Sequence, residues 1–127
     1  GTYFVGYKFY VLYWLLPYLT AFQMITWFIE LSEHYPMIQT AKNNLEASRN
    51  RFSHAVEHFF TGIHGENYHL IHHLFPAIPF WNLEKAHKIL MKDFDYQEVN
   101  KDFGGIFFSK NNNAPMCKVL WSKYEAA

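Results

Sequence analysis

Three histidines lie within five residues of this chain: His69, His72 and His73, in the spacing His-x-x-His-His. In an α-helix successive residues turn by about 100°, so these side chains fall within a sector about 100° wide. Neutral imidazole is the commonest protein metal ligand and suits zinc, copper, iron and nickel. We therefore predict a metal site on a helix at this position. The alternative is a merely polar helix face.

Other metal motifs are absent or incomplete. The chain has no His-Glu-x-x-His, the zincin protease motif. His64-Gly65-Glu66 matches half of a zinc deaminase signature, but the other half needs two cysteines and the chain has only Cys117. Glu84 and His87 form one Glu-x-x-His unit, whereas carboxylate di-iron bundles need two units and two further glutamates. We therefore expect His87 to be a surface residue of a helix.

An apolar helix precedes the histidines. Residues 9–28 carry no charge, and a helix of that length extends about 30 Å, the thickness of the hydrocarbon core of a bilayer. Aromatic residues gather at both ends of the run, as they do at membrane interfaces. These features predict a membrane span over about residues 9–31. The alternative is a buried helix of a large soluble protein.

The cations around this helix predict its orientation. Lys8 precedes the apolar run, whereas Lys42, Arg49 and Arg51 follow it. Because Lys and Arg are enriched on the cytoplasmic side of membrane spans, we expect the C-terminal region to face the cytoplasm. Across the chain the formal charges balance at eleven of each sign. That balance excludes nucleic acid as an expected partner, since nucleic-acid binding usually needs a basic face.

A second helix is predicted from Ile38 to about His64. Within it, His54 and His58 stand at positions i and i+4, on one helix face. Such a pair can bind a metal ion, but on a helix that also bears charges it can equally be a solvated or interfacial face. The sequence leaves both interpretations of this pair open.

Prolines and a cap residue delimit the rest of the chain. Pro76 and Pro79 end the histidine-rich element, because proline lacks the N–H that a helix needs. Asn82 is a predicted N-cap for a short helix over residues 83–92. From about Asp93 the chain is a mixed tail. No strand pattern is evident, so the predicted fold class is all-α.

The segment from Asn67 to Leu83, NYHLIHHLFPAIPFWNL, closely resembles the third histidine box of the integral-membrane fatty acid desaturase family, which includes related hydroxylases and ketolases. Upstream, YWLLP at residues 13–17 opens an apolar helix and Glu33-His34 closes it. Both resemble the last membrane span of these enzymes and the Glu-His that follows. The resemblance covers about residues 7–90. It departs from the family at Trp27-Phe28-Ile29, where members often carry arginines.

The resemblance implies a metal centre of two iron ions, ligated almost entirely by histidines, with O₂ as co-substrate. The metal ligands that this chain would supply are His34, His69, His72 and His73. For His34, a lone interfacial histidine is the alternative. The two earlier histidine boxes of the family are not in this sequence. We therefore interpret the chain as the C-terminal part of a longer enzyme.

The implied architecture is the last span of a helical membrane enzyme followed by a cytoplasmic helical cap. Residues 1–92 would form the C-terminal part of the desaturase domain, with the histidine box at 67–76. Residues 93–127 would be a C-terminal cytoplasmic tail.

Glu33 and Asn67 are the candidates for orienting the ligands. A metal-bound histidine usually donates its other N–H to an oxygen acceptor, which fixes its tautomer, and both residues carry such an oxygen. For Asn67, a helix cap is an equally open alternative.

The implied reaction introduces a double bond into an acyl chain carried on a lipid, on coenzyme A or on an acyl carrier. Electrons would come from a small redox protein such as ferredoxin or cytochrome b5. Four apolar residues, Phe75, Ile78, Phe80 and Trp81, either line the entrance for the acyl chain or rest on the membrane lipid. Alternatives to desaturation are a hydroxylase or ketolase, and a non-catalytic, membrane-anchored metal-binding module.

Overall fold

The structure is a computed structural model that describes residues 2–101, 104–110 and 112–125. The chain divides into two compact units, Gly1–Leu31 and Ser32–Ala127. The regular secondary structure of the described residues is helical, as predicted, and these residues contain no strand, although Ser53 and Ser109 form an isolated antiparallel bridge. The outer ends of the predicted domains, Gly1 and Ala127, lie outside the described residues.

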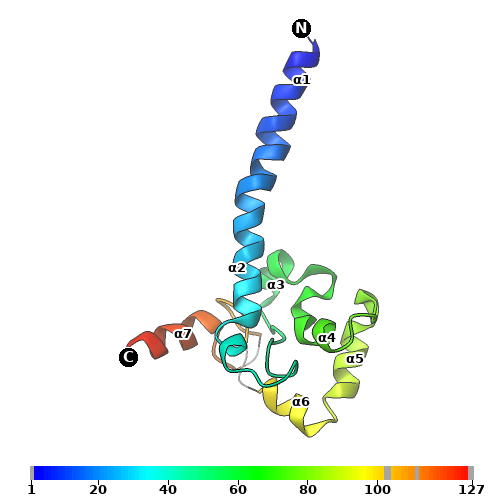
Figure 1. Cartoon of the computed structure of the whole chain (residues 1–127), viewed down its shortest axis with the longest axis vertical. Helices are drawn as coiled ribbons and strands as arrows, with labels where there is room; N and C mark the ends of the chain where they lie inside the picture. Colours follow the sequence, from blue (N-terminus) through cyan, green and yellow to red (C-terminus); the bar gives the residue numbers. More distant parts are fainter. Residues whose placement is uncertain (1, 102–103, 111, 126–127) are drawn as a thin grey trace. The chain divides into compact units, whose positions relative to one another are not determined.

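The N-terminal elements follow one another as a continuous helix that ends at His34 (Figure 1). They are α1 Thr2–Tyr10, η1 Val11–Leu15, η2 Tyr18–Phe22 and α2 Gln23–His34. From Val5 to His34 this helix is 30 residues long, and its length and composition suffice to cross a membrane. The predicted long apolar helix over about residues 9–31 is therefore confirmed.

Pro17 accounts for the irregular middle of this helix. The segments on either side of it, η1 and η2, are π-helical. Proline offers no N–H and its ring clashes with the carbonyl four residues earlier, so wider turns relieve the crowding. Thr20 Oγ1 donates to the carbonyl oxygen of Leu16 at 2.7 Å.

The second unit contains the remaining helices (Figure 1). They are η3 Met37–Gln39, α3 Ala55–Thr61, η4 Ile63–Tyr68, α4 His69–Leu74, η5 Phe80–Asn82, α5 Leu83–Leu90, α6 Phe94–Val99 and α7 Met116–Glu125. Its core centres on Leu70, Ile71, Leu83 and Tyr96, contributed by α4, α5 and α6. Because Leu70 and Ile71 are fully buried, α4 is fixed in the rotation that turns its histidines away from the core.

The predicted helix over Ile38–His64 is wrong for most of its length, since only α3 is α-helical there. Residues 48–52 instead form an irregular segment that is largely buried. The backbone N–H of Arg49 donates to the Glu33 carbonyl at 3.0 Å, and that of Arg51 donates to the Asn67 carbonyl at 2.8 Å. Tertiary hydrogen bonds thus replace the helical ones, overriding local helix propensity.

Around α5 the prediction is partly confirmed. Asn82 occupies the N-cap position, but its side chain makes no capping bond, and the helix ends at Leu90 rather than at residue 92. The surface location expected for His87 is wrong. Its ring is half-buried, its Nδ1 lies 2.9 Å from the Tyr96 hydroxyl, and burial lowers its pKa. His87 is therefore a packing residue that joins α5 to α6.

Glu57 attaches the C-terminal segment to α3. Its carboxylate accepts from Ser53 Oγ at 2.6 Å and from the backbone N–H groups of Ile106, Phe107 and Phe108 at 2.6, 2.8 and 2.7 Å. Burial alone would raise the pKa of Glu57, but these hydrogen bonds outweigh it and leave the pKa below its usual value. Loop 106–108 is therefore part of the second unit and not a loose extension.

Gly105 allows this close approach. A Cβ at this position would lie 2.2 Å from the Phe108 carbonyl oxygen and 2.9 Å from the Ser53 Cα. Because both atoms belong to the backbone, only glycine fits without moving the loop. Gly104-Gly105, for which the sequence suggested no chemistry, thus has a packing role.

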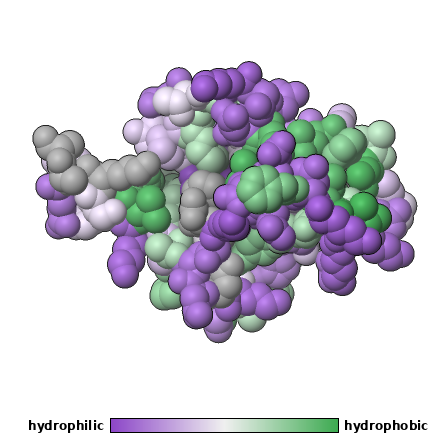
Figure 2. Space-filling view, turned by 90° about the horizontal axis from the view of Figure 1, so that it is seen from below, coloured by the Kyte–Doolittle hydropathy of each residue, from purple (hydrophilic) through white to green (hydrophobic). Residues whose placement is uncertain are grey.

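The face of the molecule drawn in Figure 2 is mainly hydrophilic, with separate hydrophobic areas. Elsewhere on the second unit, α3 exposes Val56, Phe59 and Phe60, whose relative exposures are 64, 67 and 71%. A surface of this mixed kind suits a domain that meets water on one side and an apolar partner on another. The cytoplasmic location of this unit stays a prediction.

Replacing Glu57 should destabilise the second unit in a pH-dependent way. Because folding lowers the Glu57 pKa, its stabilisation is present above the unfolded pKa of about 4.3 and is lost as pH falls through the lower, folded value. Glu57→Gln should reduce the unfolding free energy by about 2 kcal/mol near neutral pH, since it weakens hydrogen bonds to a charged acceptor. Denaturant unfolding in detergent between pH 3 and 7 measures both effects.

Glu84→Gln is the matched control. Glu84 is exposed and paired with Lys88 at 2.7 Å on the same helix, so its loss should cost little. Equal destabilisation by the two substitutions would contradict the role of Glu57.

Candidate metal centre

Three imidazoles meet where α2 ends and α4 begins. His34 is the last residue of α2, and His69 and His73 lie one turn apart on α4. His69 Nε2 lies 3.0 Å from His34 Nε2 and 2.9 Å from His73 Nε2. An ion about 2.1 Å from each of two nitrogens at right angles would hold them about 3.0 Å apart. The cluster therefore has the spacing of three ligands of one metal ion.

The hydrogen bonds on the other side of the rings test whether a metal fits. His34 Nδ1 lies 3.0 Å from the Ala47 carbonyl oxygen, and His69 Nδ1 lies 3.2 Å from Glu33 Oε2. Both oxygens are acceptors, so both Nδ1 atoms carry their proton. In a neutral ring the Nε2 atom then bears a lone pair. The His34 and His69 lone pairs then face each other at 3.0 Å, an arrangement that a bound cation would stabilise.

Burial also favours the neutral form of the central ring. Together with the neighbouring imidazoles and Arg51, it lowers the pKa of His69 to about 3, which makes the Nε2 lone pair available to a metal ion. Iron, zinc and similar ions accept such donors, so the residues present fit a metal ion.

The Glu33 carboxylate, which contacts His69, belongs to a buried ion pair. Glu33 Oε1 accepts from Arg51 Nε at 2.7 Å, and the two side chains are 3 and 2% exposed. Arg51 also donates from Nη1 to Thr61 Oγ1 at 3.0 Å and from Nη2 to the Thr61 carbonyl. Glu33 thus lies between a buried arginine and a ring of the cluster. The ion pair between Glu33 and Arg51 was not predicted, because no hydrophobic periodicity in the sequence indicates that Arg51 is buried.

The two arginines also change the argument from the flanking cations. Arg49 and Arg51 are 3 and 2% exposed, and the Arg49 guanidinium donates to the Tyr35 carbonyl. Burial outweighs the opposing effect of Glu33 and, with a smaller contribution from Arg51, lowers the Arg49 pKa to about 10. Both arginines are buried in the second unit. Of the three cations that follow the apolar helix, Lys42 is therefore the exposed one.

Asn50 fixes the start of α4. Its Nδ2 donates to the Tyr96 hydroxyl at 2.7 Å and to Asn100 Oδ1 at 2.9 Å, while its Oδ1 accepts from the backbone N–H of Leu70 at 3.2 Å. The Leu70 N–H would otherwise be an unsatisfied donor of the first helical turn. This buried network therefore anchors the residue next to His69.

The other two predicted site residues, His72 and Asn67, lie outside the compact histidine cluster. The His72 ring centre lies 6.2 and 6.0 Å from those of His69 and His73, outside the compact cluster, so its role as a ligand stays a prediction. Asn67 is buried and lines a neighbouring cavity, where it bonds the Tyr68 hydroxyl. The N-cap of α4 is Tyr68. A role for Asn67 in orienting the histidines likewise stays a prediction.

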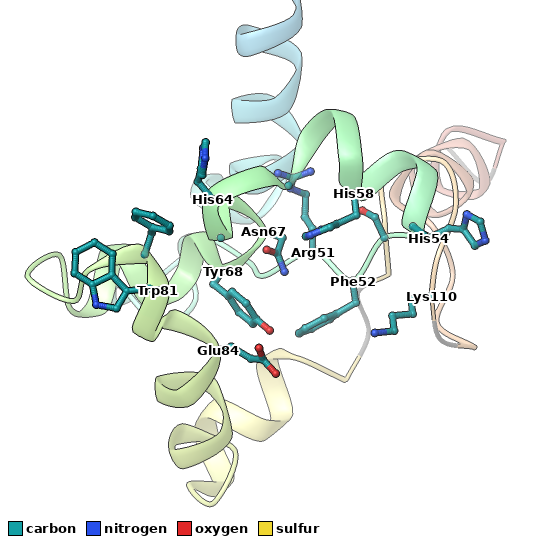
Figure 3. A pocket seen from close by; sticks show the side chains of 15 residues that line it. Arg51, Phe52, His54, His58, His64, Asn67, Tyr68, Trp81, Glu84 and Lys110 are labelled. Atoms are coloured by element: carbon teal, nitrogen blue, oxygen red, sulfur yellow. The ribbon is translucent and has the colours of Figure 1, made fainter.

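The neighbouring cavity, of about 640 Å³, contains residues whose roles the sequence left open. Arg51, Asn67 and His58 point toward its centre, whereas His54 and His64 point away from it (Figure 3). His54 and His58 are both exposed, and His54 caps the start of α3, where its Nδ1 accepts from the backbone N–H of Val56 at 3.5 Å.

This fold and site define a class: an all-α protein in which a long apolar helix ends in a histidine cluster suited to a metal ion. The class narrows on comparison with known proteins. The chain belongs to the fatty acid desaturase family, whose match covers residues 1–103.

A curated relative extends the comparison. Dihydrorhizobitoxine desaturase of Bradyrhizobium elkanii is 44% identical to this chain over 105 residues, which is 83% of this chain and 30% of the relative. The chain therefore spans less than a third of the length of that protein. No solved structure matches the chain.

Removing His69 should abolish metal binding at the cluster. In the full-length protein purified in detergent, His69→Ala should weaken Co²⁺ binding by more than about 100-fold, because loss of a supporting residue alone typically costs 10- to 100-fold. Equilibrium dialysis with metal analysis measures the change. His54→Ala, an exposed histidine of the same unit, is the control. Unchanged Co²⁺ binding by His69→Ala would refute the assignment.

Proposed function

We propose that the full-length protein is a membrane-bound, O₂-dependent di-iron desaturase, of which this chain forms the C-terminal portion. The observation that carries the proposal is the convergence of His34, His69 and His73 in a member of the fatty acid desaturase family. The 30% coverage of the relative supports the assignment of this chain to a portion of a larger enzyme.

In this proposal the chain supplies one side of the metal centre. His34, His69 and His73 would bind one iron ion through Nε2, and His72, whose ring lies about 6 Å away, would face the second. The remaining ligands would come from parts of the protein that this chain does not include. His73 is exposed in the second unit, which leaves the cluster accessible to such a partner.

The reaction follows from the family chemistry. Two adjacent methylene groups would lose one hydrogen each, and these two hydrogens, together with one O₂, two electrons and two protons, would give two waters. Iron supplies the oxidising chemistry, and a small redox protein of the ferredoxin or cytochrome b5 type would supply the electrons. The chain's own residues hold and orient the ligands: Glu33 and the Ala47 carbonyl keep the two Nδ1 protons in place, and Glu33 also ties the end of α2 to α4.

The proposed topology places the helix Val5–His34 across the bilayer, with the second unit on the cytoplasmic side. The proposed domain division, 1–92 and 93–127, assigns α6 and α7 to the C-terminal region. The exposed aromatic residues Phe80 and Trp81 would then meet the lipid or the acyl substrate.

Two substrates are candidates. An acyl chain on a lipid, coenzyme A or a carrier is the substrate class implied by the family. Dihydrorhizobitoxine is the second candidate, because the relative named for that activity is 44% identical over 83% of this chain. Both candidates use the same metal centre and differ in the group that the enzyme must accommodate.

The function is tested with the full-length protein, a reducing system and each substrate. Mass spectrometry should show a product lighter by two hydrogens, whereas a gain of one oxygen would identify a hydroxylase and refute desaturation. His72→Ala and His73→Ala should each abolish the product and lower bound iron. Retained iron and turnover in both variants would refute the ligand assignment.

The membrane assignment has its own test. The 127-residue chain expressed alone should partition with membranes and require detergent for extraction, because the helix Val5–His34 is long and apolar enough to cross a bilayer. Carbonate washing followed by detergent extraction measures this partition. The matched control is a variant with Leu12, Leu16 and Leu19 each replaced by Arg, which should weaken membrane insertion strongly. Recovery of the unmodified chain as a soluble monomer would contradict the span.

A further inference from the structure

Arg51 is among the least exposed charged side chains of the second unit, at 2%. It lies on an irregular segment, not on either helix that carries the histidines. Burying an ion pair costs desolvation energy that its attraction often only matches, and an apolar pair of similar volume is frequently as stable. Stability alone therefore explains poorly why a charged pair occupies this position.

The hydrogen bonds of Arg51 fix both its ends. The backbone N–H donates to the Asn67 carbonyl at 2.8 Å, which ties Arg51 to the turn before α4. The guanidinium donates to Glu33 Oε1 at 2.7 Å and to the Thr61 hydroxyl at 3.0 Å. The N–H groups of a guanidinium point in fixed directions within one plane. These bonds therefore set the direction of the Glu33 carboxylate from Arg51 as well as its distance from Arg51.

The second oxygen of the same carboxylate meets the metal cluster. With Oε1 held by Arg51, Oε2 lies 3.2 Å from His69 Nδ1. That bond selects the tautomer with the proton on Nδ1 and leaves the Nε2 lone pair toward His34 and His73. If the carboxylate turned away, His69 could place its proton on Nε2 and lose its ability to bind a metal there.

We propose that Arg51 is a positioning residue of the metal centre, which fixes the Glu33 carboxylate so that His69 keeps its proton on Nδ1 and presents Nε2 to the metal. The inference rests on the proposed metal site, and it adds a residue that touches neither the metal nor the substrate. Its effect passes through Glu33.

The test is Co²⁺ titration of the full-length protein in detergent, followed by visible absorption, whose bands report the ligand set. Arg51→Met should weaken Co²⁺ binding by about 10- to 100-fold and alter the bands. Glu33→Gln should act similarly. If Arg51 acts through Glu33, the two substitutions remove the same interaction and their effects should not add. The variant that carries both should then bind Co²⁺ no more weakly than the single variant that has the lower affinity.

Two further variants separate positioning from general stability. Glu57→Gln also disturbs a buried charged group of this unit, but it should leave Co²⁺ affinity and absorption unchanged. If Arg51→Met does not fold, Arg51→Lys replaces it. That substitution keeps the charge but loses the planar fork, so it should still weaken Co²⁺ binding by about tenfold. Wild-type affinity and bands in a folded Arg51 variant, or additive losses in the double variant, would overturn the proposal.

Product formation is not a readout of this test. A protein that binds Co²⁺ at the histidines but desaturates neither substrate would refute the proposed function and leave the role of Arg51 supported if its variants behave as expected. Conversely, desaturation by a protein whose Arg51 variants bind Co²⁺ normally would overturn only the role of Arg51.

Discussion

The buried contact of Glu33 with Arg51 and His69 is the constraint on which the second unit depends. It joins the last turn of α2, the irregular segment 48–52 and the first residue of α4 through a single carboxylate. Segment 48–52 is irregular and α4 has only six residues, so neither holds its position by local structure alone. Because the carboxylate serves two partners, the packing of the unit and the orientation of the histidines cannot be adjusted separately.

The histidine cluster depends on a short helix, α4, whose position is fixed by buried side chains. α4 has six residues, yet Leu70 and Ile71 fix its rotation and Asn50 fixes its first turn. With α4 held in this way, His69 and His73 lie close to His34. In return, the site tolerates few changes around it, because a half-satisfied buried network is more costly than an apolar one.

The sequence predicted the parts that depend on local pattern. The apolar helix, the all-α class and the family follow from the uncharged run and from the His-x-x-His-His motif with its proline-rich extension. The structure also brings His34 to His69, as the motif resemblance implied. The prediction failed where long-range contacts decide: segment 48–52 gives up helical hydrogen bonds for bonds to Glu33 and Asn67, and His87 is drawn inward by Tyr96. The hydrophobic periodicity of the sequence does not indicate these long-range hydrogen-bond partners.

The attachment of loop 106–108 to Glu57 has a consequence for how this family diverges. The family match ends at residue 103, whereas the N–H groups that satisfy Glu57 come from residues beyond it. A relative with a different C-terminal segment would leave a carboxylate here buried without those donors, which is strongly unfavourable. Position 57 and the segment after residue 103 should therefore change together during evolution, so an acidic residue here would mark the relatives that share this ending.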